Sequence, residues 1–169
     1  RINDKLVTNF LEFASIIDNK VGEMISVELE RSGQIIKEMI EVTDLHSITP
    51  DTFLQFGDAV VHNLSYQQVR HHNQPLKGIY VADPGYIFSK SAIPHGAIIH
   101  EVDGKAVTSI DSLKAILSVL DDGDRTTIRF TTMDDPNNSI VRLIQMDRVW
   151  FPLKHCIRDD SLGIWPCEE

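Results

Sequence analysis

The chain has few of the features that mark a membrane, secreted or nucleic-acid-binding protein. No apolar run approaches the roughly 20 residues that span a bilayer, and no basic-then-apolar amino terminus resembles a signal peptide. Binding to nucleic acid requires a basic face, whereas the formal net charge is -9 and the longest basic grouping is Arg70-His71-His72. These absences predict a soluble intracellular segment that binds neither nucleic acid nor membrane.

Residues for metal binding and catalysis are also scarce. The chain has two cysteines, Cys156 and Cys167, which lack the paired C-x-x-C spacing of a zinc site, and we interpret them as reduced thiols. The histidines lack H-E-x-x-H spacing, so neither a metal nor another cofactor is predicted. Serine hydrolysis places its nucleophile on a strained turn, and no G-x-S-x-G motif occurs. A hydrolase built on Ser161 or Cys156 is therefore the least favoured hypothesis, and no catalytic residue is predicted.

An internal repeat organises what is present. When Ile2 is placed on Val102, the order turn, helix, strand, turn, strand occurs twice, which is typical of a copied supersecondary unit. Only the second copy has further strands and a helix in front of it. We therefore predict the later part of a first domain over 1–44, a linker over 45–55, a complete domain over 56–148 and a tail over 149–169.

Apolar periodicity and turn signals predict the elements of both copies. Asn9 is a suitable N-cap for a helix because its side chain can accept a hydrogen bond from an early helical N–H. Expected helices cover 9–18, 64–72 and 109–120, and expected strands cover 24–29, 35–42, 58–62, 78–82, 97–102, 126–132 and 139–146.

The complete domain has the parts of a peptide-binding groove. A strand that follows a glycine-containing loop and faces a helix can accept an extended peptide as an additional strand, while loop N–H groups capture its terminal carboxylate. The helix positions fit a plain hydrophobic core equally well. The predicted site comprises the loop and edge strand Phe56, Gly57, Asp58, Ala59, Val60 and Val61, with the helix residues Leu113, Ile116 and Leu117.

Several strings of residues resemble one protein family. Gly78–Val107, with Pro94-His95-Gly96 and the ending V-D-G-K-A-V, resembles the middle of a PDZ domain of the HtrA type. Residues 44–51 (DLHSITPD), 63–70 (NLSYQQVR) and the tail from Trp150 are similar to the fungal nuclear HtrA-type serine proteases and, more loosely, to their plant Deg-type relatives. The resemblance implies an α+β fold: a PDZ-like, partly open β-barrel or sandwich with two helices, preceded by the later half of another PDZ domain.

The resemblance also implies a function. The segment would be a non-catalytic, regulatory or substrate-positioning part of a nuclear serine endopeptidase linked to protein quality control and apoptosis-like death. Its catalytic triad would lie outside these residues. Its partners would be protein or peptide segments and the protease domains of the parent, which could also assemble as a homo-oligomer. The alternative is a stand-alone adaptor module that binds peptides without protease activity.

One residue departs from the family pattern. HtrA-type carboxylate loops read apolar-Gly-apolar before the edge strand, whereas Asp58 holds the glycine position here and Gly57 comes one place early. A carboxylate at Asp58 would repel the terminal carboxylate of a peptide at short range. We therefore expect weak or no binding of carboxyl-terminal peptides.

Overall fold

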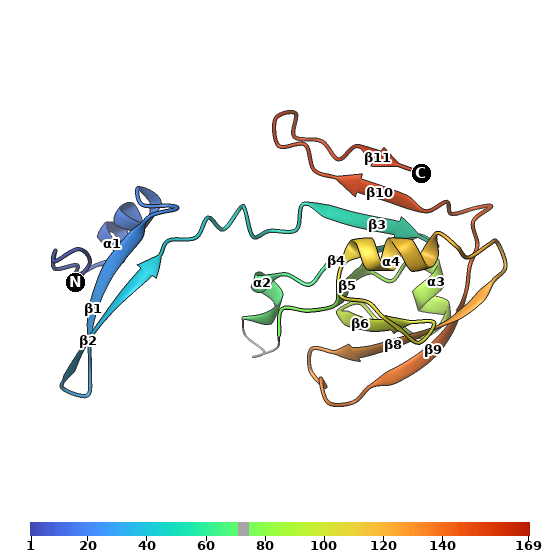
Figure 1. The fold of residues 1–169 in the computed structure, drawn as a ribbon, viewed down its shortest axis with the longest axis horizontal. Helices are drawn as coiled ribbons and strands as arrows, with labels where there is room; N and C mark the ends of the chain where they lie inside the picture. Colours follow the sequence, from blue (N-terminus) through green and yellow to red (C-terminus); the bar gives the residue numbers. More distant parts are fainter. Residues whose placement is uncertain (71–74) are drawn as a thin grey trace. The chain divides into compact units, whose positions relative to one another are not determined.

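The computed structural model describes residues 1–70 and 75–169 and divides them into two compact units, Arg1–Ile48 and Thr49–Glu169 (Figure 1). Each unit has an apolar cluster of its own. Within the described residues, no helix is long and apolar enough to cross a membrane.

The first unit consists of one helix and one hairpin. Helix α1 (Phe10–Asp18) begins where the Asn9 side chain accepts a hydrogen bond from the backbone N–H of Glu12, which confirms the expected N-cap. Strands β1 (Met24–Arg31) and β2 (Gln34–Glu41) pair antiparallel. Ser32 and Gly33 join them with φ of 52° and 79°, the left-handed values that a two-residue hairpin turn requires.

The second unit is built on one mostly antiparallel sheet with the order β11-β10-β3-β4-β5-β6-β8-β9, and β7 pairs with β6 (Figure 1). Three helices belong to it: α2 (Tyr66–Val69), α3 (Gly85–Lys90) and α4 (Ile110–Leu117). Its strands are β3 (Thr52–Phe56), β4 (Ala59–Asn63), β5 (Ile79–Asp83), β6 (Ala97–Val102), β7 (Lys105–Ala106), β8 (Arg125–Thr132), β9 (Ile140–Gln145), β10 (Lys154–Ile157) and β11 (Cys167–Glu168).

The repeat seen in the sequence is present in the backbone. Equivalent positions of the two copies make equivalent backbone hydrogen bonds, with lengths between 2.7 and 2.9 Å. The N–H of Asn3 donates to the carbonyl of Ser26, as the N–H of its counterpart Asp103 donates to the carbonyl of Thr127. In the same way Gly22 donates to the carbonyl of Val42, and its counterpart Gly123 donates to the carbonyl of Met146. The copies differ in burial, because the side chain of Phe10 is 89% exposed whereas its counterpart Ile110 is 1% exposed.

The structure differs from the expected elements in three places. The expected linker, 45–55, contains all of strand β3 except its last residue, Phe56, and the expected tail, 149–169, contains β10 and β11. Helix α3 lies in the excursion after β5, where no helix was expected, so the described residues of the second unit form three helices instead of the two expected there. Helix α2 is shorter than the expected 64–72; residues 71 and 72 lie outside the described residues.

The interpretation of the cysteines as reduced thiols is wrong in this structure. Cys156 of β10 stands directly opposite Cys167 of β11 in the antiparallel register, and their sulfur atoms are bonded. Opposite residues of an antiparallel pair bring their Cβ atoms close enough for a disulfide. The bond fastens the last strand to the rest of the sheet.

Candidate peptide-binding groove

The groove predicted from the sequence would lie between β4 and α4, and the structure joins the end of one to the start of the other. The hydroxyl of Ser109 accepts a hydrogen bond from the backbone N–H of Ser112 and caps α4. The side chain of Asn63, at the end of β4, accepts a hydrogen bond of 2.8 Å from the backbone N–H of Ile110. This bond fixes the start of the helix beside the end of the strand.

Strand β3 lies beside β4 at the place where a peptide would add. It pairs antiparallel with β4, with Leu54 opposite Val61 and Phe56 opposite Ala59, and α4 packs against it. Strand β5 pairs with the other side of β4. The edge expected on β4 is therefore occupied in this structure, because both of its sides carry a strand.

The predicted carboxylate loop is a two-residue hairpin turn. Gly57 and Asp58 have φ of 54° and 62°, which suits the turns that join tightly paired strands, and aspartate tolerates such values better than most residues. The backbone N–H of Ile87 donates to the carbonyl of Gly57 at 2.9 Å, so the start of α3 lies on the turn. Gly85 approaches so closely that a Cβ there would lie 2.1 Å from the carbonyl carbon of Asp58.

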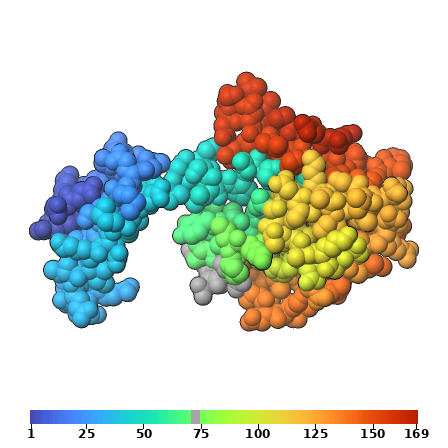
Figure 2. Space-filling view, viewed as in Figure 1, coloured from blue at the N-terminus to red at the C-terminus, as the bar shows by residue number. Residues whose placement is uncertain are grey.

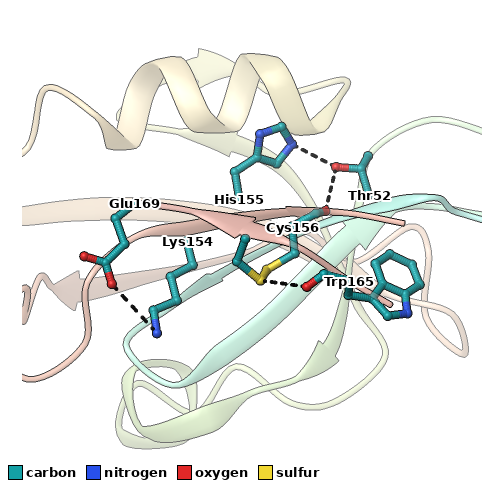
Figure 3. The surroundings of a disulfide bond; sticks show 7 residues. Thr52, Lys154, His155, Cys156, Trp165 and Glu169 are labelled. Carbon is teal, nitrogen blue, oxygen red and sulfur yellow. Dashed lines mark hydrogen bonds and ion pairs between the residues drawn. A yellow bond between two sulfur atoms is a disulfide. The ribbon is translucent and has the colours of Figure 1, made fainter. Parts of the chain in front are cut away.

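The other side of β3 is covered by β10, and hydrogen bonds join Thr52 of β3 to His155 and Cys156 of β10 (Figure 3). A further hydrogen bond links His155 to α4. The ammonium of Lys114 has only donors, so it donates to Nδ1 of His155 at 3.0 Å. The Nε2–H of that ring then donates to Oγ1 of Thr52 at 2.8 Å. The hydroxyl of Thr52 donates in turn to the carbonyl of Cys156 at 3.2 Å.

The rest of the tail adds contacts to the start of β3. The backbone N–H of Arg158 donates to the carbonyl of Asp51 at 2.8 Å, and the ring of Trp165 packs against Phe53 with 5.2 Å between centroids. Figure 2 shows the red tail lying against the residues of β3 and α4. Trp165 therefore packs on the second unit, whereas Trp150 is 78% exposed.

The structure brings most of the predicted site residues together as core. They share one apolar cluster with residues of β5, β6 and β8. Val60 is half-buried, and Asp58 is exposed at the turn. Leu54 was missed by the sequence reasoning and occupies the centre of this cluster with no exposed surface. The predicted residues in the cluster are Phe56, Ala59, Val61, Leu113 and Leu117, with Ile116 packed on its margin.

Two histidines on the sheet are partly buried. Burial lowers the pKa of His62, on β4, and the pKa of His100, on β6. Nδ1 of His62 is 2.7 Å from the carbonyl oxygen of Asn63, and its ring packs on Tyr80. The hydrogen bond to Asn63 raises the pKa, but burial has the larger effect.

Both nucleophiles considered in the sequence have a bonding partner in this structure. The hydroxyl of Ser161 donates to the carboxylate of Asp159 at 2.6 Å in an exposed turn, and this bond with two backbone N–H donors lowers the pKa of Asp159. A serine nucleophile needs a base that takes its proton. Cys156 is buried and bonded to Cys167, so it offers no free thiolate.

A second concave feature lies elsewhere on this unit. An open hollow of about 740 Å³ is lined by residues of α3 and β9 and by Val149 and Trp150. The hydroxyl of Ser91 donates to the carbonyl of Leu143 across its floor at 2.9 Å. Its lining combines exposed apolar side chains with both acidic and basic side chains, so it does not indicate one class of ligand.

Comparison with known proteins agrees with this geometry. Residues 47–123 match the family model of the PDZ-like domain. Over 98% of its length the chain is 38% identical to Protease Do-like 7 of Arabidopsis thaliana and 30% identical to the pro-apoptotic serine protease NMA111 of Pyricularia oryzae. Over 97% of its length it is 33% identical to NMA111 of Lodderomyces elongisporus. The chain spans only 15%, 16% and 17% of these relatives.

The α+β fold with its mostly antiparallel sheet, the family match and these relatives lead to one conclusion. Residues 47–123 carry a PDZ-like domain, and nearly the whole chain is similar to segments of HtrA-type, Do-like serine proteases.

Proposed function

We propose that this chain is a non-catalytic segment that positions substrates or regulates the protease domains of a nuclear HtrA-type serine endopeptidase. The observation that carries the proposal is the similarity of nearly the whole chain to segments of proteases that the relatives' names describe as Do-like or pro-apoptotic. The catalytic triad would lie in the parent, outside these residues. Protein quality control and apoptosis-like death would be the parent's processes.

The first unit has a place in the same proposal. It repeats the later half of the second unit, yet its helix exposes Phe10 and Phe13 by 89% and 45%, whereas their counterparts Ile110 and Leu113 are 1% and 0% exposed. In the complete unit the equivalent helix face is buried by the strands that precede it in sequence. We therefore propose that residues 1–44 are the later half of another PDZ domain, and that 56–148 contain the main body of a complete one, which β3 and the tail strands extend.

The experiment compares two substrates of the full-length parent. Gly85→Ala is expected to disrupt the second unit, because the added Cβ meets the backbone of Asp58 and Ala59. Cleavage of an unfolded protein substrate should fall about tenfold or more, while hydrolysis of a short chromogenic peptide stays within twofold, roughly, because the triad is elsewhere. Gly104→Ala is the matched control, because its Cβ meets nothing within 4 Å. Equal losses on both substrates, or none on either, would contradict a positioning role.

The alternative is a stand-alone adaptor that binds peptides. It requires that the segment itself capture peptides, and strand β3 beside β4 disfavours this at the predicted groove.

A fluorophosphonate probe tests the hydrolase hypothesis. The isolated segment should not be labelled, and labelling at Ser161 would show that catalysis occurs within it.

A further inference from the structure

We infer that the groove between β4 and α4 is a binding site for an extended apolar segment, and that strand β3 of the same chain is its resident ligand. A peptide that binds by strand addition makes main-chain hydrogen bonds with a sheet edge and places alternate side chains in pockets. The assignment requires only the PDZ-like fold and holds whether or not a protease domain accompanies it.

The register of β3 meets the first requirement of such a ligand. It runs antiparallel to β4 over four residue pairs, from Phe53 opposite His62 to Phe56 opposite Ala59. Helix α4 packs on β3, so β3 has the strand on one side and the helix nearby. These are the two walls between which an added peptide strand lies.

The side chains of β3 meet the second requirement. Residues two apart in a strand point to the same face, and Leu54 and Phe56 both have 0% exposure. They lie in one apolar cluster with Leu113 and Leu117 of α4. Gln55, between them, is only half-buried. The groove is thus filled by two apolar side chains in an apolar-x-apolar pattern.

The direction of β3 explains the unusual loop. Phe56 is the last residue of β3 and leads directly into Gly57 and Asp58. The chain therefore continues through the position at which a bound peptide would end in a carboxylate. Asp58 serves as the second residue of a tight turn there and has an exposed side chain, so its charge faces solvent instead of a ligand carboxylate.

The tail closes the site from the other side. Strand β10 pairs with β3 from Lys154 opposite Gln55 to Ile157 opposite Thr52, and His155 joins Thr52 to Lys114 of α4. Neither side of β3 or of β4 is left as a free edge. The expectation of weak binding by carboxyl-terminal peptides therefore gains a steric reason in addition to the charge of Asp58.

The test separates a ligand from an ordinary core strand. The full chain is compared with a variant that carries a protease recognition sequence inserted between Gly57 and Asp58 and is then cut there. The probe is a synthetic peptide of residues 50–56, Pro-Asp-Thr-Phe-Leu-Gln-Phe, with a free carboxyl terminus. Native mass spectrometry follows release of the amino-terminal fragment from the cut chain, and NMR titration follows the β4 amides of the intact chain.

The intact chain should not bind the peptide at concentrations up to about 1 mM, because β3 fills the groove. The cut chain should remain a one-to-one complex and release its amino-terminal fragment when the peptide is in excess. A peptide with Leu54→Ala should be needed at about tenfold higher concentration to release the same amount of the amino-terminal fragment. A peptide with Gln55→Ala should act at the same concentration as the original peptide.

Several results would overturn the inference. Low-micromolar binding of the peptide to the intact chain, with shifts of the β4 amides, would show that the groove is open; this arm needs no insertion. A cut chain that unfolds, that never exchanges its fragment, or that exchanges it equally with all three peptides would show that β3 is only part of the core. Protease activity does not enter these measurements, so their failure is distinct from failure of the proposed function.

Discussion

Gly85→Ala is expected to destabilise the second unit by more than about 4 kcal/mol, which is exceptional for a single substitution. The Cβ would lie 2.1 to 2.3 Å from three backbone atoms of Asp58 and Ala59. Backbone atoms cannot rotate away as a flexible side chain can, and φ of Gly85 is +50°, which adds the strain of a left-handed L-residue. The measurement is urea unfolding followed by circular dichroism.

The matched control separates the steric clash from backbone strain. Gly104 also has a positive φ, +69°, but a Cβ there meets nothing within 4 Å. Gly104→Ala should therefore lower the free energy of unfolding by about 1 to 2 kcal/mol, the effect of placing an L-residue in the left-handed conformation. Similar costs for both substitutions would show that α3 does not lie on the Gly57–Asp58 turn as described.

Phe56→Ala is expected to cost about 3 to 5 kcal/mol, the range for removing a buried aromatic side chain. Its ring has no exposed surface and packs edge-on against Phe88 with 5.4 Å between centroids. Removal leaves a cavity where β3, β4 and α3 meet, because close-packed neighbours relax only partly. The free energy of unfolding by urea measures the loss.

Gln55→Ala provides the control on the same strand. Gln55 is half-buried and lies outside the apolar cluster, so its replacement should change stability by less than about 0.5 kcal/mol. Gln55 and Phe56 are neighbours on the same strand, and their side chains point to opposite faces. The two variants together therefore test which face of β3 is buried. An equal effect at both positions would contradict the register of β3 on β4.

Elements with long, regular patterns could be predicted from the sequence. The stripe of Leu113, Ile116, Leu117 and Leu120 predicted α4, which ends at Leu117 and not at Leu120. The signal before Phe10 predicted α1 and its cap, as observed. The repeat was visible because turns at the two equivalent positions need left-handed residues, here Asn3-Asp4 and Asp103-Gly104. In each case local chemistry and tertiary packing favour the same structure.

Strand β3 was missed although the sequence contained its signal. Leu54 and Phe56 alternate, and Gly57-Asp58 followed by an apolar run is typical of a two-residue hairpin. The family resemblance led instead to a carboxylate loop, and residues 45–55 were interpreted as a linker. A strand of five residues is recognised securely only when its partners are known, because its stability comes from β4, β10 and α4.

The short elements and the disulfide depend on tertiary contacts in the same way. Helix α3 spans six residues, too few for a periodic pattern, and β11 spans two. The register of β10 and β11 places Cys156 opposite Cys167, which spacing in the sequence does not reveal. Because disulfides are rare in nuclear proteins, this bond and the proposed nuclear location point to different compartments.

Hydrogen exchange of the intact chain tests the central claim most directly, because it reports whether β3 is a permanent part of the groove. Amides in the sheet interior exchange only on large-scale unfolding, whereas edges and mobile segments exchange through local opening. The amides of Leu54 and Phe56 are predicted to exchange as slowly as those of Ile79 and Val81 on β5. Fast exchange of β3 while β5 stays protected would contradict the account, because it would show a groove that opens to external ligands.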